Sequence, residues 1–270
     1  MESDPNFPVG VFDSGVGGLS ILKALQAELA QEDFVYFADS GFAPYGERDA
    51  EHVIARSRSI TQQLIDQHQI KALVVACNTA TAAAIHVLRA EFPALPIVGV
   101  EPALKPAVAL SQTRHIGVMA TRGTLVSAKF QALLASLAGQ AEFTLQPCDG
   151  LADAIEHHDA TRVIALCRDY TKALGQFGLK SGEKDTLVLG CTHYAFAEAT
   201  LRSLIGPQVQ LIETGQPVAQ HTRRLLAAAP LLRPQGQGQG QTSFQTTGQP
   251  VDLQQAVARW LGQNVVVKSG

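Results

Sequence analysis

The sequence predicts an α/β fold made of two related domains with parallel sheets. Short apolar strands alternate with helical segments along the chain, which is typical of parallel sheets. Two of the strands end on a thiol: the run 73–76 leads to Cys77, and the run 187–190 leads to Cys191, 114 positions later. A small hydroxyl or amide residue follows each cysteine at once. We interpret the two thiols as equivalent positions of a duplicated unit.

The duplication extends to two further pairs of strands. The run 9–14 is echoed by 116–121, which aligns Ser14 with Thr121. The run 34–37 is echoed by 143–146. The pairs occur in the same order and at similar offsets, which argues for a duplicated α/β unit. The alternative explanation is that unrelated α/β units share strands rich in Val and Ile.

The first unit begins with a strand at 9–12, which leads through a glycine-rich turn into a helix near 19–30. The glycines allow a tight turn and close approach of the backbone. The other elements expected here are strands at 34–38, 72–76 and 97–100, and helices near 50–68 and 80–91. A crossover around residues 101–102 leads to the second unit.

The second unit repeats this plan. Its expected strands are 115–119, 142–146, 186–190 and 208–212, with helices near 123–137, 151–157, 160–175, 195–205 and 216–228. A Gln-Gly linker at 233–241 has too little apolar content to pack and is expected to be flexible. A strand at 242–247 and a helix at 251–262 follow it. Since the second unit has its four strands by residue 212, we expect a discontinuous first domain, 1–101 with 212–270, and a second domain, 102–211.

The composition limits the classes of function. The chain of 270 residues is 46% hydrophobic, and its net charge of −3 provides no basic face for nucleic acid or an anionic membrane. No apolar run approaches the ~20 residues of a transmembrane helix. The polar, acidic start at 1–8 is unlike a signal peptide. The cysteines form no CxxC pair, so we expect free thiols in a reducing cytoplasm; they are Cys77, Cys148, Cys167 and Cys191.

Polar residues cluster where strands are expected to end. In parallel sheets, ligands bind beyond the carboxyl ends of the strands. If the two units pack with those edges facing, the site lies in the cleft between the domains. The residues at such positions are Asp13, Ser14, Cys77, Asn78, Thr121, Cys191 and Thr192.

The two strand-end thiols suggest acid–base chemistry. A thiol at the start of a helix has a lowered pKa and can take or return a proton at neutral pH. Two thiols on opposite sides of one carbon could therefore invert its configuration. Cys148 and Cys167 are interpreted as structural. The surrounding polar groups are mostly neutral donors suited to carboxylates, and Asp13 suits an ammonium group, so we expect a small zwitterionic substrate.

Four segments of the chain resemble signature segments of the glutamate racemases, the cofactor-independent branch of the aspartate/glutamate racemase superfamily. They are 13–19 (DSGVGGL), 44–46 (PYG), 76–80 (ACNTA) and 190–194 (GCTHY), and 246–248 (TTG) also fits. The resemblance spans about residues 8–230. It implies conversion of L-glutamate to D-glutamate for peptidoglycan, without pyridoxal phosphate or metal. It also implies two flavodoxin-like domains related by pseudo-two-fold symmetry.

By this resemblance Cys77 and Cys191 are the two bases, with Cys77 acting on D-glutamate and Cys191 on L-glutamate. The assisting residues would be Asp13, His193 and Glu156. The substrate-binding positions would be Asp13, Ser14, Pro44, Tyr45, Gly46, Asn78, Thr79, Thr121, Thr192 and His193. The expected partner is glutamate, without nucleic acid or membrane, and the sequence is compatible with a homodimer.

The chain departs from the family pattern in places. Ala195 replaces a frequent proline, which should change the start of a helix. Glu156 lies in an Ile-Glu-His-His stretch instead of Glu-Glu-Gly, so its assignment rests on the nearest match. Only a short segment precedes the first strand, so we expect no activation by a cell-wall precursor through an N-terminal extension.

Other hypotheses stay open. His193, Cys191 and Cys77 could form a metal site, but they offer three ligands and would consume both thiols. We expect His193 to tune Cys191 instead. A racemase for aspartate would typically carry an acidic residue in place of His193. A cysteine hydrolase would need only one thiol and a base, and an amino-acid-binding module would bind without turnover.

Overall fold

The computed structural model describes residues 4–234, 236 and 238–270. The chain forms two compact units, the first made of Met1–Val100 and Gly215–Gly270 and the second of Glu101–Thr214. Within the described residues, each unit contains a single sheet, of six strands in the first and four in the second. All the strand pairs are parallel. The predicted fold class, α/β with two parallel sheets, is confirmed.

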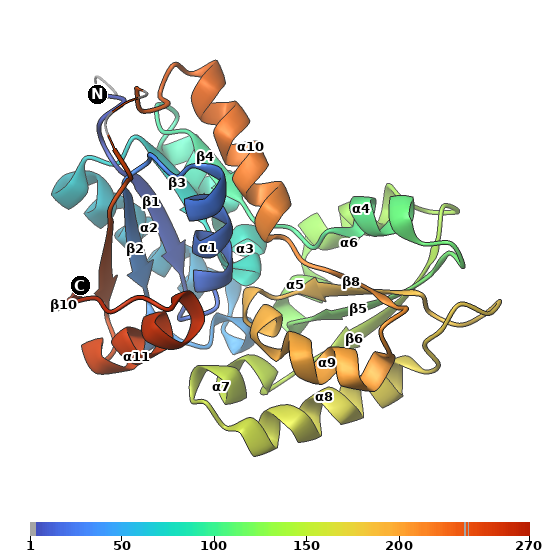
Figure 1. The fold of residues 1–270 in the computed structure, drawn as a ribbon. Helices are drawn as coiled ribbons and strands as arrows, with labels where there is room; N and C mark the ends of the chain where they lie inside the picture. The colour runs from blue at the N-terminus through green and yellow to red at the C-terminus, as the bar shows by residue number, and fades with distance from the viewer. Residues whose placement is uncertain (1–3, 235, 237) are drawn as a thin grey trace. The chain divides into compact units, whose positions relative to one another are not determined.

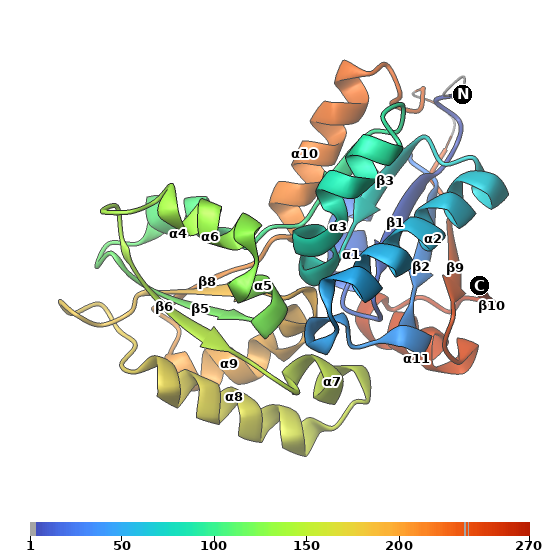
Figure 2. The same cartoon turned by 180° about the vertical axis from the view of Figure 1, so that it is seen from behind.

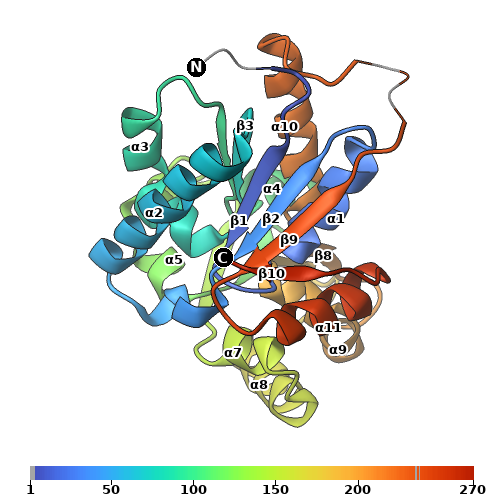
Figure 3. The same cartoon turned by 90° about the vertical axis from the view of Figure 1, so that its left-hand side faces the viewer.

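The sheet of the first unit has the order β10-β9-β2-β1-β3-β4. These strands are β1 (Val9–Asp13), β2 (Phe34–Ala38), β3 (Ala72–Val75), β4 (Ile97–Gly99), β9 (Thr242–Thr246) and β10 (Val267–Ser269). Helices α1 (Leu19–Glu28), α10 (Gly215–Ala228) and α11 (Pro250–Leu261) cover one face, as Figure 1 shows. Helices α2 (Ala50–His68) and α3 (Asn78–Glu91) cover the other face, as Figures 2 and 3 show. The central strand β1 is therefore buried along its whole length.

The sheet of the second unit has the order β6-β5-β7-β8. Its strands are β5 (His115–Ala120), β6 (Glu142–Pro147), β7 (Thr186–Gly190) and β8 (Gln210–Ile212). On one face lie α7 (Leu151–Glu156), α8 (Ala160–Leu174) and α9 (Glu198–Ile205), and on the other α4 (Leu104–Leu110), α5 (Arg122–Val126) and α6 (Ala128–Ala135) (Figure 1). Strand β7 contributes side chains to the cores on both faces of the sheet. Leu187 and Leu189 pack on the face covered by α7, α8 and α9, and Val188 packs on the face covered by α4, α5 and α6.

The two sheets repeat the same strand order and the same register. In each, the first strand of the unit lies between the second and the third, and the fourth follows the third; this 2-1-3-4 order is the beginning of the flavodoxin-like order. The equivalent ladder pairs are Val9–Phe34 with Ile116–Phe143, and Val9–Ala72 with Ile116–Thr186. The echoes found in the sequence are therefore structural equivalents.

Several predicted elements were wrong in detail. The single helix expected at 123–137 is two helices, because Ser127 caps α6 by accepting a hydrogen bond from the Phe130 N–H (3.1 Å). Helix α4 lies where only a crossover was expected. The helix expected at 195–205 begins as a 3₁₀ turn, Thr192–Ala197, and becomes α9 at Glu198. Strand β10 was not predicted.

The Gln-Gly linker is held at both ends by the loop before β2. The Arg233 N–H donates to Glu32 Oε1 (2.8 Å), and the Gln241 N–H donates to Asp33 Oδ1 (2.7 Å). The prediction of flexibility covers residues 235 and 237, which lie outside the described residues. In the part of the chain that the structure describes, no helix has the length and apolar character needed to cross a membrane.

A buried carboxylate holds the loop after α4 against β7. Asp185 accepts hydrogen bonds from Ser111 Oγ (2.6 Å), the N–H groups of Gln112 (2.6 Å) and Thr113 (2.8 Å), and Thr186 Oγ1 (2.9 Å). Burial alone would favour the neutral acid. The hydrogen bonds outweigh burial and hold the pKa of Asp185 below its ordinary value.

We expect Asp185→Asn to destabilise the protein by about 1–3 kcal/mol at neutral pH. The asparagine side chain has an NH₂ group in place of one carboxylate oxygen, and this donor would face buried donors that have lost their acceptor. The lowered pKa means that the carboxylate stabilises the fold fully above about pH 3.9, and that this contribution is lost as the pH falls through the native pKa. Urea unfolding of both proteins between neutral and acidic pH measures the difference. A difference that does not shrink on acidification would contradict this role.

Candidate active site

The carboxyl end of β1 forms a turn organised by one carboxylate. Asp13 is buried, and its Oδ2 accepts hydrogen bonds from the N–H groups of Gly15 (3.1 Å) and Gly18 (2.9 Å). The Tyr36 hydroxyl donates to the Gly15 carbonyl (2.7 Å) and holds the same turn from β2. A Cβ on Gly18 would lie 2.6 Å from Asp13 Cβ, so this close approach requires glycine. The turn fixes the position of Ser14.

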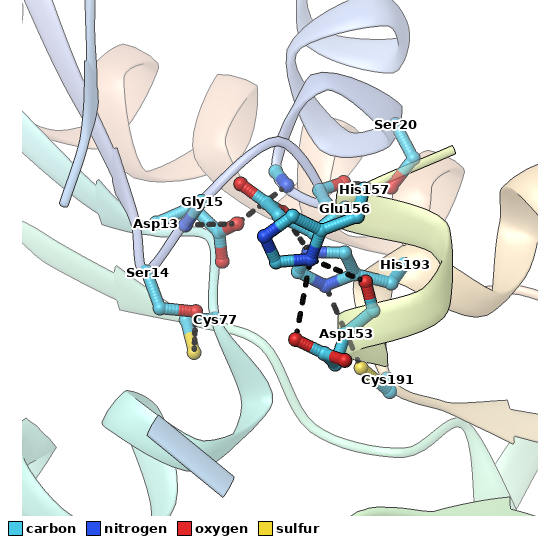
Figure 4. Close-up of polar contacts among 12 residues, drawn as sticks. Asp13, Ser14, Gly15, Ser20, Cys77, Asp153, Glu156, His157, Cys191 and His193 are labelled. Atoms are coloured by element: carbon cyan, nitrogen blue, oxygen red, sulfur yellow. Dashed lines mark hydrogen bonds and ion pairs between the residues drawn. The ribbon is translucent and has the colours of Figure 1, made fainter. Parts of the chain in front are cut away.

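Cys77 lies beside Ser14, just beyond the end of β3. It is the N-cap of α3, and its Sγ accepts a hydrogen bond from the Ala80 N–H (3.4 Å). The thiol donates to Ser14 Oγ across 3.6 Å, as Figure 4 shows. The Cys77 side chain is largely buried. The N–H groups at the start of a helix stabilise a thiolate, so this position suits a thiol that cycles between its two charge states.

Asn78, the first residue of α3, presents an unsatisfied amide oxygen. Its Nδ2 donates to the Val100 carbonyl (3.4 Å). Its Oδ1 is buried and has no hydrogen-bond partner among the described residues. A buried carbonyl without a donor is unfavourable, so this oxygen is suited to accept a hydrogen bond from a ligand. Thr79 is buried next to it.

The loop after β2 carries the Pro44-Tyr45-Gly46 segment and is anchored by Asp39. The Tyr45 hydroxyl donates to Asp39 Oδ2 (2.5 Å), and Arg56 donates to both oxygens of the same carboxylate (2.9 and 2.7 Å). Burial and the adjacent Asp39 charge both raise the pKa of Tyr45, so its phenol stays neutral. The Tyr45 side chain holds the loop, and Pro44 and Gly46 are half-buried beside it.

Cys191, at the end of β7 in the second unit, belongs to a chain of three polar side chains. Its Sγ lies 3.8 Å from His193 Nδ1, and His193 Nε2 lies 2.6 Å from Glu156 Oε2 (Figure 4). His193 is buried in the 3₁₀ turn that follows β7, and Glu156 is the last residue of α7. The two ring nitrogens of His193 are thus engaged by a thiol and a carboxylate.

This arrangement favours a protonated imidazole. Burial by itself lowers the pKa of His193, but hydrogen bonds to Cys191 and Glu156 outweigh it and raise the pKa well above the ordinary value. An imidazolium beside Cys191 stabilises the thiolate. Glu156 therefore fixes the ring and balances its charge.

The remaining predicted residues of the second unit lie at the same sheet edge. Thr121 follows β5 and caps α5, accepting from the Thr124 N–H (3.3 Å). Thr192 is buried next to Cys191. By contrast, Cys148 and Cys167 lie in the apolar core, where burial raises the pKa of Cys148 and brings that of Cys167 to about 11.

The structure brings the predicted residues together as two groups, one at the strand ends of each unit. Asp39 and Tyr36 were missed by the sequence reasoning. Asp39 directly follows β2, as Asp13 ends β1, and this position could have identified it. Tyr36 carries no local signal, because its role depends on a contact with the neighbouring strand. Among the described residues, no group of three or more His, Cys, Asp or Glu side chains is arranged to hold a metal ion.

The comparisons with known proteins agree with one another. The family model described as Asp/Glu/Hydantoin racemase matches residues 19–222. A glutamate racemase of Ralstonia pickettii is 48% identical over 266 residues, which cover 97% of this chain and 91% of that protein. The crystal structure of a glutamate racemase isoform from Bacillus anthracis has a TM-score of 0.86 and 29% identity, covering 98% of both chains. That of a Francisella tularensis glutamate racemase in complex with D-glutamate has a TM-score of 0.82 and 26% identity, covering 98% of this chain and 97% of that one.

We expect His193→Gln to slow the alkylation of Cys191 by iodoacetamide at neutral pH, because glutamine cannot place a positive charge beside the Cys191 Sγ. In a Cys77→Ala background, the rate constant should fall by about tenfold or more. Glu156→Gln should lower the rate constant in the same direction but less far. An unchanged rate constant in His193→Gln would show that the imidazolium does not support the thiolate.

Proposed function

Since the chain belongs to the Asp/Glu/Hydantoin racemase family, we propose that it interconverts L- and D-glutamate by moving the α-proton between Cys77 and Cys191. The curated relatives that it matches over most of its length are glutamate racemases, which supports the choice of substrate. We further propose that the enzyme works in the cytoplasm and that its D-glutamate is used in peptidoglycan synthesis.

The equivalence of the two thiols is the observation that carries this proposal. Cys77 follows β3 and Cys191 follows β7, and these strands occupy the same place and register in their sheets. A nucleophile or a structural cysteine would need no counterpart in the other unit. A racemase that works with two bases needs one acid–base group on each face of the carbon, because each group acts as the base in one direction and as the acid in the other.

The reaction needs only the transfer of protons. For L-glutamate, the Cys191 thiolate takes the α-proton, and the electron pair of the broken C–H bond stays on Cα. The Cys77 thiol then donates its proton to the opposite face and becomes the thiolate. The product is D-glutamate, and the D-to-L direction runs through the same steps in reverse.

The carbanion is the difficult intermediate, because an amino-acid α-proton is very weakly acidic. Preorganised donors to the α-carboxylate and exclusion of water lower this barrier. In the first unit, we assign the hydroxyl groups of Ser14 and Thr79 to the α-carboxylate, and the buried Asn78 Oδ1, unpartnered among the described residues, to the ammonium group. In the second unit, we assign Thr121 and Thr192 to the side-chain carboxylate.

The two thiols are supported differently. Cys77 accepts a hydrogen bond from the Ala80 N–H at the start of α3. Cys191 depends on a charged pair, His193 with Glu156. We therefore infer that His193 and Glu156 act on racemisation in both directions, since Cys191 is the base for L-glutamate and the acid for D-glutamate. Asp13 holds the turn of the first unit, and we assign its negative charge to the ammonium group of the substrate.

Replacement of either thiol by alanine should lower racemisation by about 10²–10⁴-fold or more, since one face loses its acid–base group. The remaining thiol should still act on its own face. We expect Cys77→Ala to eliminate chloride only from the L-configured isomer of threo-3-chloroglutamate, and Cys191→Ala only from the D-configured isomer.

Cys148→Ala and Cys167→Ala serve as controls for loss of a buried thiol and should keep turnover within a few-fold. The measurement is 2-oxoglutarate release from each isomer, together with racemisation of glutamate followed by circular dichroism. The mechanism with two opposed thiols would be refuted if Cys77→Ala and Cys191→Ala showed the same stereochemical preference, or if either of them kept near-normal racemisation.

Aspartate should be a poor substrate. A site that satisfies a buried carboxylate at one chain length leaves its donors unpaired when the substrate is one methylene shorter. We expect kcat/KM for aspartate to be lower than that for glutamate by at least about 100-fold. Comparable values would instead indicate a racemase of broad specificity.

A further inference from the structure

The segment at which the chain first crosses from one unit to the other is held by hydrogen bonds from α3, the helix that follows Cys77. The first unit ends at Val100, and Glu101 begins the second. The Val100 N–H donates to Thr81 Oγ1 (3.0 Å), and the Val100 carbonyl accepts from Asn78 Nδ2 (3.4 Å). Both backbone groups of Val100 are therefore held by side chains from the first turn of α3.

Thr81 also reaches back to the strand that leads to Cys77. Its hydroxyl donates to the Val75 carbonyl (3.2 Å) while accepting from Val100, so one oxygen ties the ends of β3 and β4 together. The side chain is buried, and a Cβ on Gly99 would lie 2.6 Å from Thr81 Cγ2. This close fit leaves the threonine little freedom to move.

The same connection lies against the other thiol-bearing strand in the second unit. Pro102 is buried, and a Cβ on Gly190 would lie 3.3 Å from Pro102 Cγ. Gly190 is the last residue of β7 and directly precedes Cys191. The segment 100–102 is thus held at one end by the turn after Cys77 and at the other by the residue before Cys191.

We propose that Thr81 is a positioning residue for racemisation, which fixes the 100–102 connection against the strand end that carries Cys77. The proposal rests on the proposed two-thiol function. Its consequence is that Thr81 matters more for a reaction that needs both thiols than for one that needs a single thiol, because both reactions use the binding groups of the two units but only the first also needs the second thiol in place. We assign Thr81 no contact with the substrate, and its effect passes through Val100.

The physical reason is the geometry of proton transfer. Inversion requires that the thiol of the second unit meets the carbanion made by the thiol of the first, and a misplacement of about 1 Å can cost about 100-fold. Elimination from a D-configured chloroglutamate needs only Cys77. The Cys77 thiolate takes the α-proton, the electron pair forms the Cα–Cβ double bond, and chloride leaves. The enamine then takes up water and yields 2-oxoglutarate and ammonium.

The test is the ratio of racemisation of D-glutamate to elimination from D-configured threo-3-chloroglutamate, measured as kcat/KM on one preparation. This ratio does not depend on the fraction of active enzyme, so a loss of folded protein cannot move it. We expect Thr81→Val to lower it by about tenfold or more. Thr81→Ser keeps the hydroxyl and should restore it to within about twofold of the wild-type value.

Thr61→Val is the matched control. Thr61 is also fully buried, and its hydroxyl donates a hydrogen bond to the Ser57 carbonyl (2.7 Å). It lies within α2, however, and among the described residues it makes no hydrogen bond to the 100–102 connection. Its ratio should stay at the wild-type value. Pro102→Ala, at the other end of the connection, should lower the ratio as Thr81→Val does.

An unchanged ratio in Thr81→Val, or an equal fall in Thr61→Val, would overturn the assignment. A wild-type enzyme that does not racemise glutamate would instead refute the proposed function, so the two failures are distinguishable. A fall in Thr81→Val that Thr81→Ser does not restore would show that volume, and not the hydroxyl, is what matters, and this also would overturn the proposal.

Discussion

Parallel pairing in one register is the constraint on which the site depends. Because β1 and β3 run side by side in the same direction, their carboxyl ends place Ser14 next to Cys77. The equivalent pairing of β5 with β7 sets Thr121 and Cys191 at one edge of the second sheet. A slip of either pair by one residue would turn a thiol toward the opposite face. The buried strands and the helix layers that cover them hold this register.

Given that register, the surroundings of each thiol decide its chemistry. Cys77 lies at a helix N-terminus and accepts a hydrogen bond from the Ala80 N–H, whereas His193 and Glu156 form an ion pair beside Cys191. Duplication has therefore supplied two equivalent positions, and divergence has given them different partners.

The sequence predicted what local patterns and repetition encode. The strands, the equivalence of Cys77 with Cys191 and the family membership are confirmed by the sheet pairing and by the family match. The break at Ser127 was missed because a serine inside an apolar run can sit within a helix or cap a new one, and packing decides between them. The hydrogen bonds of Asp39 and Thr81 were missed because they join different elements of the fold through side chains, which no local pattern encodes. The predicted roles of the individual site residues stay predictions.

The origin of the hydrogen that enters the product tests the opposed-thiol account most directly. Wild-type enzyme is incubated with unlabelled L-glutamate in deuterium oxide, and the first D-glutamate to form is analysed by mass spectrometry. The account predicts one deuterium at Cα in the D-glutamate and protium in the remaining L-glutamate, because the proton is removed by one thiol and the new hydrogen comes from the other. Product that retains the original protium would mean that a single group moves the proton between faces, and would contradict the account.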